Sequence, residues 1–101
     1  MTKERCLIIW KEEKVAWITI EQTDMWYWDC SYNDPFKTSA SEMFLNIITK
    51  LDIKKSFNNW SLGLEVEILY EGDETKKGNI LILGFVDSIL CVRTLTNRVE
   101  A

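Results

Sequence analysis

The sequence predicts an α+β domain: an antiparallel β-sheet of five or six strands with one α-helix packed on a face. Residues 62–70 alternate strictly between apolar and polar side chains, which is typical of a half-buried strand. Residues 79–86 are apolar on both faces, and a single helical stripe follows Ser39. Because the connections are short and the chain has 101 residues, we expect one domain spanning residues 1–101.

The N-terminal part of the chain predicts a hairpin followed by more extended chain. Residues 6–10 and 15–20 are rich in β-branched and apolar residues, and the charged residues 11–14 form the turn between them. Residues 24–32 (DMWYWDCSY) have a period of two and form a third strand or the continuation of the second. Pro35 ends this run because proline cannot donate to a strand ladder.

The helix is predicted to begin at Ser39 and to run for about 14 residues. Ser39 and Glu42 have the spacing of a capping box. Behind them Phe44, Ile48 and Leu51 belong to one apolar stripe that packs on the sheet.

The remaining chain predicts three strands. Residues 58–61 are a loop before the strand 62–70, and residues 71–78 are a polar loop before the central strand 79–86. A tight turn at residues 87–88 leads into the last strand, 89–95, and we expect residues 96–101 to fray.

The chain lacks the residues on which most catalysis depends. It has no histidine, which removes the commonest general base and most zinc sites, and it has no glycine-rich phosphate-binding motif. Its three cysteines, an odd number without paired spacing, predict buried thiols in a reducing compartment. We therefore expect no enzyme, no metal site and no cofactor.

Two groups of acidic residues could have a chemical role, but each is better explained as solvated surface. Glu65 and Glu67 share one strand face and could act as paired carboxylates, but their alternation favours a solvated face. Glu71, Asp73 and Glu74 could hold a divalent cation, but two lysines follow at once and a solvated loop is favoured.

The charge balance constrains the partner. The net charge of −4 and a pI near 4.8 argue against direct nucleic-acid binding and are compatible with a basic protein. No apolar run approaches the roughly 20 residues that span a bilayer, so we expect a cytoplasmic protein that does not bind membranes.

The aromatic run is the main candidate for a binding surface. Trp10 and Trp17 are predicted to be core, whereas Trp26 and Trp28 are either a core face or an exposed anchor, a role in which tryptophan is enriched. Acids beside an exposed anchor would suit arginine or lysine, by cation–π contact and ion pairing. The predicted partner-binding residues are Asp24, Trp26, Trp28, Asp29, Asp34, Glu65, Glu67, Glu71, Asp73 and Glu74.

The acidic aromatic run DMWYWDCSYND, the loop EGDE and the α+β layout resemble the bacterial toxin-immunity proteins of the contact-dependent growth-inhibition or colicin type. The resemblance implies a cytoplasmic inhibitor that binds a cognate toxin domain, often a nuclease with a basic active site. Such an inhibitor combines a few buried aromatic anchors with a charge-steered encounter.

The alternative is a small ligand-binding module. Its aromatic pocket would be built on the sheet from Trp26, Trp28, Tyr32 and Trp60. In either case an unpaired outer strand would allow sheet extension by a partner, or a homodimer.

Overall fold

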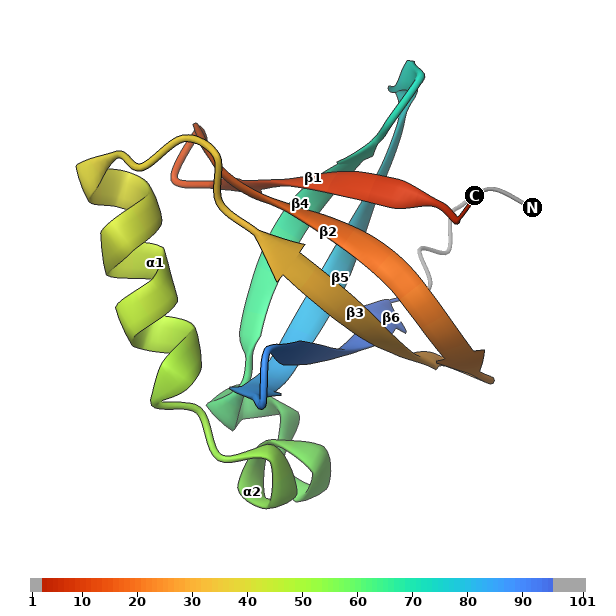
Figure 1. The fold of residues 1–101 in the computed structure, drawn as a ribbon. Helices are drawn as coiled ribbons and strands as arrows, with labels where there is room; N and C mark the ends of the chain where they lie inside the picture. Colours follow the sequence, from red (N-terminus) through yellow and green to blue (C-terminus); the bar gives the residue numbers. More distant parts are fainter. Residues whose placement is uncertain (1–2, 96–101) are drawn as a thin grey trace.

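Six antiparallel strands form a closed barrel in the computed structural model, which describes residues 3–95 except for the side chain of Glu74 (Figure 1). The strands are β1 (Arg5–Trp10), β2 (Glu13–Asp24), β3 (Tyr27–Asn33), β4 (Leu64–Tyr70), β5 (Asp73–Val86) and β6 (Ile89–Leu95). Their order around the barrel is β1-β2-β3-β6-β5-β4, and β4 pairs back onto β1. The α+β prediction with antiparallel strands is confirmed, but the sheet is closed.

Closure removes the outer strand that we expected to be open to a partner. Each of the six described strands pairs with a neighbour on both sides. The expectation of an unpaired outer strand is therefore wrong for the described part of the chain, because a closed barrel has no edge.

Two three-stranded meanders build the barrel. β1, β2 and β3 are joined by tight turns, as are β4, β5 and β6. β4 returns beside β1 through a long connection, residues 34–63, which gives β4, β1, β2 and β3 a Greek-key order. This connection carries all of the described helices, α1 (Ser39–Thr49), α2 (Ile53–Asn58) and the 3₁₀-helix η1 (Trp60–Leu62).

Helix α1 lies across one end of the barrel, where it contacts both β2 and β5 (Figure 1). Phe44 and Ile48 are fully buried, and the Phe44 ring lies 5.6 Å from the ring of Trp10. The helix begins at Ser39 as predicted, but the capping box lies one residue earlier, because Thr38 is the N-cap and its partner is Ser41, not Glu42. It has 11 residues and ends at Thr49.

Helix α2 was not predicted, so the expectation of one helix is wrong. Asp52 caps it by accepting a hydrogen bond from the Lys55 N–H, and α2 and η1 pack on the outside of β5. The approach is close: a Cβ on Gly84 would lie 2.3 Å from Cγ1 of Ile53. β5 is therefore covered on both faces, as its apolar sequence predicts.

Strand β5 is longer than predicted. It begins at Asp73 and has 14 residues, so only Glu71 and Gly72 turn the chain where we expected a loop of residues 71–78. The fraying predicted for residues 96–101 concerns a segment outside the described residues.

The barrel interior holds two of the three cysteines. Cys6 and Cys30 are fully buried, and burial raises the pKa of each thiol to about 12. Trp10 is also buried, but the prediction that Trp17 is core is wrong. Trp17 is half-buried and the guanidinium of Arg5 lies 4.6 Å above its ring.

Candidate functional site

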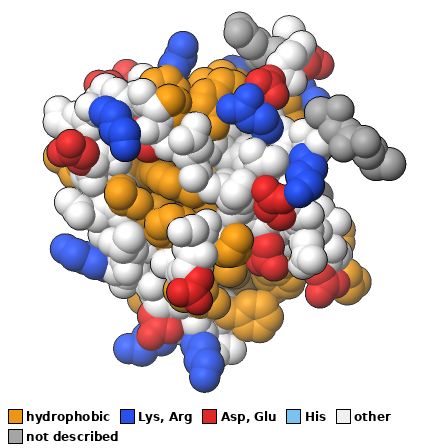
Figure 2. Space-filling model, viewed as in Figure 1, with side chains coloured by type: hydrophobic (Ala, Val, Ile, Leu, Met, Phe, Trp, Pro, Cys, Tyr) orange, Lys and Arg blue, Asp and Glu red, His pale blue; other side chains and the backbone are white. Residues whose placement is uncertain are grey.

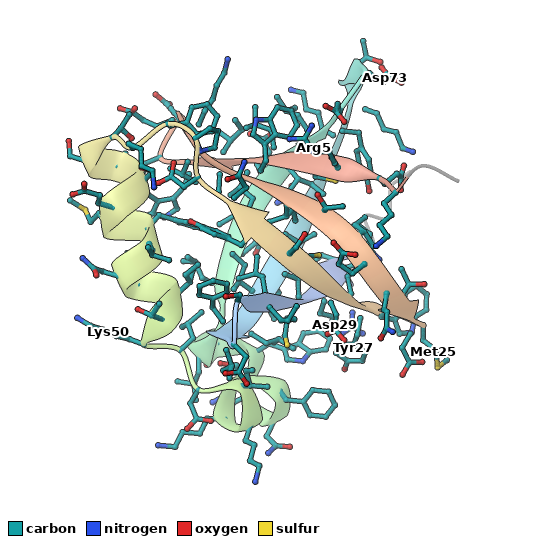
Figure 3. The ribbon with its side chains drawn as sticks, in the orientation of Figure 1. Arg5, Met25, Tyr27, Asp29, Lys50 and Asp73 are labelled. Carbon is teal, nitrogen blue, oxygen red and sulfur yellow. The ribbon has the colours of Figure 1, made fainter. Side chains whose placement is uncertain are left out.

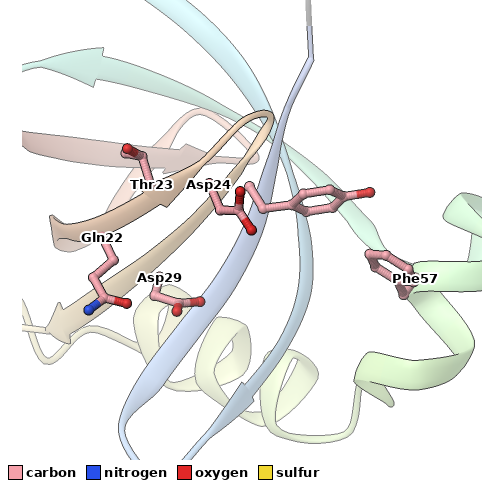
Figure 4. A pocket seen from close by; sticks show the side chains of 6 residues that line it. Gln22, Thr23, Asp24, Asp29 and Phe57 are labelled. Atoms are coloured by element: carbon pink, nitrogen blue, oxygen red, sulfur yellow. The ribbon is translucent and has the colours of Figure 1, made fainter.

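A groove on the outer surface of the barrel combines aromatic rings with carboxylates. It has a volume of about 400 Å³ and is formed by the ends of β2 and β3 together with α2. Figure 4 shows Asp24 and Asp29 on the strands and Phe57 opposite them on the helix. We call it the β3 groove; its lining residues are Gln22, Thr23, Asp24, Tyr27, Asp29 and Phe57.

Strand pairing explains why the acids meet in the groove. Asp24 lies opposite Tyr27 and Gln22 lies opposite Asp29, and directly opposed residues in an antiparallel pair point to the same face. A bulge between Ile20 and Gln22 shifts the register that places them there.

An aromatic cluster surrounds Arg93 beside the groove. The Arg93 guanidinium carbon lies 4.1 Å from the ring centroid of Trp60, 5.6 Å from that of Tyr27 and 6.0 Å from that of Trp26. The Tyr27 ring in turn lies 5.3 Å from the Phe57 ring. We call these five residues the Arg93 cluster.

The cluster is open to solvent. Trp26 and Phe57 are each 50% exposed, and Trp60 is 46% exposed. Met25, in the turn before β3, is 84% exposed. Figure 2 shows hydrophobic side chains between α2 and the end of β2, with acidic side chains beside them. Because these rings lie next to one another, they form a contiguous apolar patch of the kind that marks interaction surfaces.

The two groove carboxylates have no cationic partner among the described side chains. The ion pairs in residues 3–95 are Lys3–Glu21, Arg5–Glu71 and Lys76–Glu4. Asp29 is instead near Cys91, whose Sγ lies 3.7 Å from Oδ1 of Asp29. Burial, together with this carboxylate, raises the pKa of the Cys91 thiol.

A second shallow depression continues from Asp29 toward Glu21. Glu21 accepts hydrogen bonds from Lys3 and from the hydroxyl of Ser31, and these bonds lower the pKa of the Glu21 carboxyl. The carboxylate of Glu21 is thus already paired with the Lys3 ammonium, whereas those of Asp24 and Asp29 have no such partner among the described side chains.

Trp26 and Trp28, the two predicted anchors, lie in different environments. Trp26 lies in the turn between β2 and β3 and is exposed, whereas Trp28 is partly buried and packs against the core. The period of two predicted for residues 24–32 would place Trp26 and Trp28 on one face; this is wrong at Trp26, because the turn interrupts the alternation that places Trp28, Cys30 and Tyr32 inward. Of the predicted residues, Asp24, Trp26 and Asp29 therefore lie together.

Asp34 has a local structural contact. It lies between β3 and α1, and its Oδ1 accepts hydrogen bonds from the backbone N–H groups of Phe36 and Lys37. Burial opposes ionisation, but these bonds and one from the Ser41 hydroxyl outweigh it and lower the pKa of Asp34.

The remaining predicted acids are distributed over other parts of the barrel. Glu65 and Glu67 are exposed on β4, which lies opposite β3 in the ring of strands, and Glu65 accepts a hydrogen bond from Asn79. Asp73 is at the tip of the β4–β5 hairpin, far from Asp29 (Figure 3).

Both acids at the tip of that hairpin have contacts within the chain. Glu71 pairs with Arg5 at 2.7 Å, and Asp73 accepts hydrogen bonds from Thr75. The side chain of Glu74 lies outside the described part of the structure.

The aromatic pocket of the alternative prediction is not assembled. Tyr32 packs against the core inside the barrel and its ring lies 5.0 Å from Phe85, and burial raises the Tyr32 pKa to about 12. Trp28 also packs against the core, whereas Trp26 and Trp60 are exposed beside Arg93. The four residues do not line one cavity.

Sequence reasoning did not place Phe57 or Arg93 in the site. Phe57 belongs to α2, whose only clear signal is Asp52 at the N-cap position. Arg93 is a single charge in an apolar strand, and no local pattern shows that it meets Trp60 from another segment.

Comparison of the chain with protein-family models, curated proteins and solved structures found no match. Within residues 3–95, no helix is long and apolar enough to cross a membrane. In the same range, no group of three or more acidic, cysteine or histidine side chains is arranged to hold a metal ion.

Proposed function

We propose that this chain is a binding protein that captures a basic protein partner through the β3 groove and the Arg93 cluster. The observation that supports this most directly is the placement of half-exposed Trp26, Phe57 and Trp60 beside two carboxylates without a cationic partner in the described chain. Tryptophan, tyrosine and arginine are the residue types most enriched at binding hot spots.

The two parts of the surface have different roles in this proposal. The rings provide affinity, because a partner that covers them removes a large apolar area from water. Asp24 and Asp29 provide selectivity and attract a basic surface before contact.

The partner in this proposal is a toxin domain, as the resemblance to immunity proteins implies. The chain would then neutralise the toxin by covering a basic active site, with the Arg93 cluster seated on apolar surface beside it. A gene next to this one that encodes a large secreted protein with a variable C-terminal domain would identify that partner.

A pair of charge reversals tests the proposal. Asp29→Lys and Glu67→Lys both reverse one exposed carboxylate on a strand, but they lie on opposite sides of the barrel. With the purified neighbouring toxin domain, calorimetry should show an affinity loss of about 100-fold or more for Asp29→Lys, equivalent to roughly 2.7 kcal/mol.

Glu67→Lys should change the affinity by less than about threefold, as expected for a charge outside the interface. Thermal unfolding should show that both variants remain folded. Equal affinities for the two variants, or growth inhibition by the toxin that the native chain does not relieve, would contradict the proposed function.

A further inference from the structure

The β3 groove has the components of a site for a single cationic side chain. Asp24 and Asp29 supply two carboxylates, and Tyr27 and Phe57 supply two rings whose centroids are 5.3 Å apart. Its volume of about 400 Å³ is at the small end of the range for ligand pockets. The groove is thus better suited to one long side chain than to a large ligand.

Elsewhere in the same chain, an arginine side chain is bound by a ring and a carboxylate in this way. On β1, the Arg5 guanidinium lies 4.6 Å above the Trp17 ring while its Nη1 donates to Oε2 of Glu71 at 2.7 Å. Stacking and ion pairing therefore act on the same guanidinium at that site. The β3 groove presents rings and carboxylates in the same way, but among the described side chains no cation is paired with its carboxylates.

Arg93 does not fill that position. Its guanidinium is stacked on Trp60 at 4.1 Å and Nη1 donates to the backbone carbonyl of Thr94, and no ion pair joins it to Asp24 or Asp29. The residues that line the groove include two carboxylates and no basic side chain. An incoming cation is attracted to the carboxylates of Asp24 and Asp29. The Tyr27 ring contacts both the Arg93 guanidinium and the Phe57 ring of the groove.

We propose that the β3 groove receives an arginine side chain of the partner, with its guanidinium paired to Asp24 and Asp29 and stacked on Tyr27 or Phe57. This inference rests on the proposed function and names the group that the surface recognises. Arginine is preferred over lysine because its planar fork forms two parallel hydrogen bonds with a carboxylate and its face stacks on a ring. An ammonium group forms neither contact as well.

The inference is tested with small probes and the free chain. Backbone amide NMR spectra would be recorded while N-acetyl-arginine methylamide is added, at constant ionic strength. The controls are the lysine analogue and the citrulline analogue, which keeps the length and shape of arginine without its charge. Shifts should be confined to the residues of the β3 groove, with a dissociation constant on the order of millimolar for arginine.

The lysine analogue should bind at least about threefold more weakly, and the citrulline analogue should produce no saturable shift. The double variant Asp24→Asn, Asp29→Asn keeps the side-chain shapes and should lose at least about tenfold in arginine affinity, equivalent to about 1.4 kcal/mol. Equal binding of citrulline, or shifts outside the groove, would overturn the inference.

The two proposals can fail separately. If arginine does not bind but Asp29→Lys still abolishes toxin capture, the surface binds a partner without an arginine in the groove. If arginine binds and Asp29→Lys captures the toxin normally, the groove recognises arginine but is not the toxin interface.

Discussion

The guanidinium carbon of Arg93 lies 4.1 Å from the centre of the Trp60 ring. This contact joins β6 to η1 through two residues that are 33 positions apart in the chain. The same guanidinium approaches Tyr27 and Trp26, at the start of β3. Arg93 therefore links three of the segments that form the aromatic surface, namely β6, η1 and the start of β3.

Replacing Arg93 should weaken this link and lower stability. We expect Arg93→Ala to reduce the free energy of unfolding by about 1–2 kcal/mol, because a partly desolvated cation–π contact and the packing of the side-chain stem are lost. Arg93→Lys should be intermediate, since it keeps the charge but not the flat stacking face. Urea denaturation measures both.

Lys11→Ala is the matched control for Arg93. The Lys11 ammonium lies 5.0 Å above the Trp10 ring but is exposed, so its removal should cost less than about 0.5 kcal/mol. A loss for Arg93→Ala no larger than this would mean that the contact does not hold the cluster together.

Gly84 should be intolerant of any side chain. A Cβ there would lie 2.3 Å from Cγ1 of Ile53, so Gly84→Ala must shift the Ile53 side chain, displace α2 or distort β5. We expect destabilisation of about 1–3 kcal/mol, typical of overpacking, measured by chemical denaturation. The cost should fall in an Ile53→Ala background, because the clashing atom is then absent.

Gly78, on the same strand, provides the comparison. A Cβ there would be 3.7 Å from its nearest neighbour, an ordinary contact distance, so Gly78→Ala should change stability by less than about 0.5 kcal/mol. Similar effects at the two glycines would show that α2 does not press on β5 as described.

The strands were largely predictable because their patterns are local. Residues 89–95 form β6 as predicted, and the two-faced apolar pattern of residues 79–86 matches a strand covered on both sides. Closure of the barrel depends on the pairing of β1 with β4, for example Leu7 with Leu69, and no periodicity in either strand specifies its neighbour. Helix α2 has six residues, too few to show a 3.6-residue period.

The candidate site was predictable only in part for the same reason. The positions of Asp24 and Asp29 follow from residues close in sequence, but the period-two pattern left open whether Trp26 is exposed or core. That Glu67 lies on the far side of the barrel follows from the strand order, which joins segments that the sequence does not relate. Phe57, Trp60 and Arg93 meet through tertiary packing alone.

Alkaline pH should destabilise the fold through its buried thiols. Cys6 and Cys30 have their pKa raised from 9.0 to about 12 by burial, so the unfolded chain releases these protons first. Above pH 9 the unfolded state therefore binds fewer protons than the folded state, and the free energy of unfolding falls as the pH rises toward 12. Each thiol contributes a slope of at most about 1.4 kcal/mol per pH unit in this window.

Tyr32, whose pKa is raised from 10.0 to about 12 by burial, adds to the loss above pH 10. Denaturation at fixed pH values from 8 to 11 should reveal the slope, and Cys30→Ala should make it shallower by about one proton equivalent. An unchanged slope in that variant would mean that Cys30 is not protected from ionisation in the folded chain.

Trp26 and Trp28 should respond in opposite ways to truncation. Trp28 packs against the core, so Trp28→Ala should lower the free energy of unfolding by about 3 kcal/mol or more through lost burial and a cavity. Trp26 is half exposed, and its contact with Thr94 is made by its backbone carbonyl, which the substitution retains. Trp26→Ala should therefore cost less than about 1 kcal/mol in stability.

The same Trp26→Ala variant should lose partner affinity by about 30-fold, equivalent to roughly 2 kcal/mol, if Trp26 is a hot spot of the interface. Calorimetry with the toxin domain measures the affinity, and urea denaturation of both variants measures the stability. A stable Trp28→Ala variant, or a Trp26→Ala variant that unfolds, would reverse the assignment. In that case the exposure of the ring would not distinguish a tryptophan that stabilises the fold, as we assign Trp28, from one that binds the partner, as we assign Trp26.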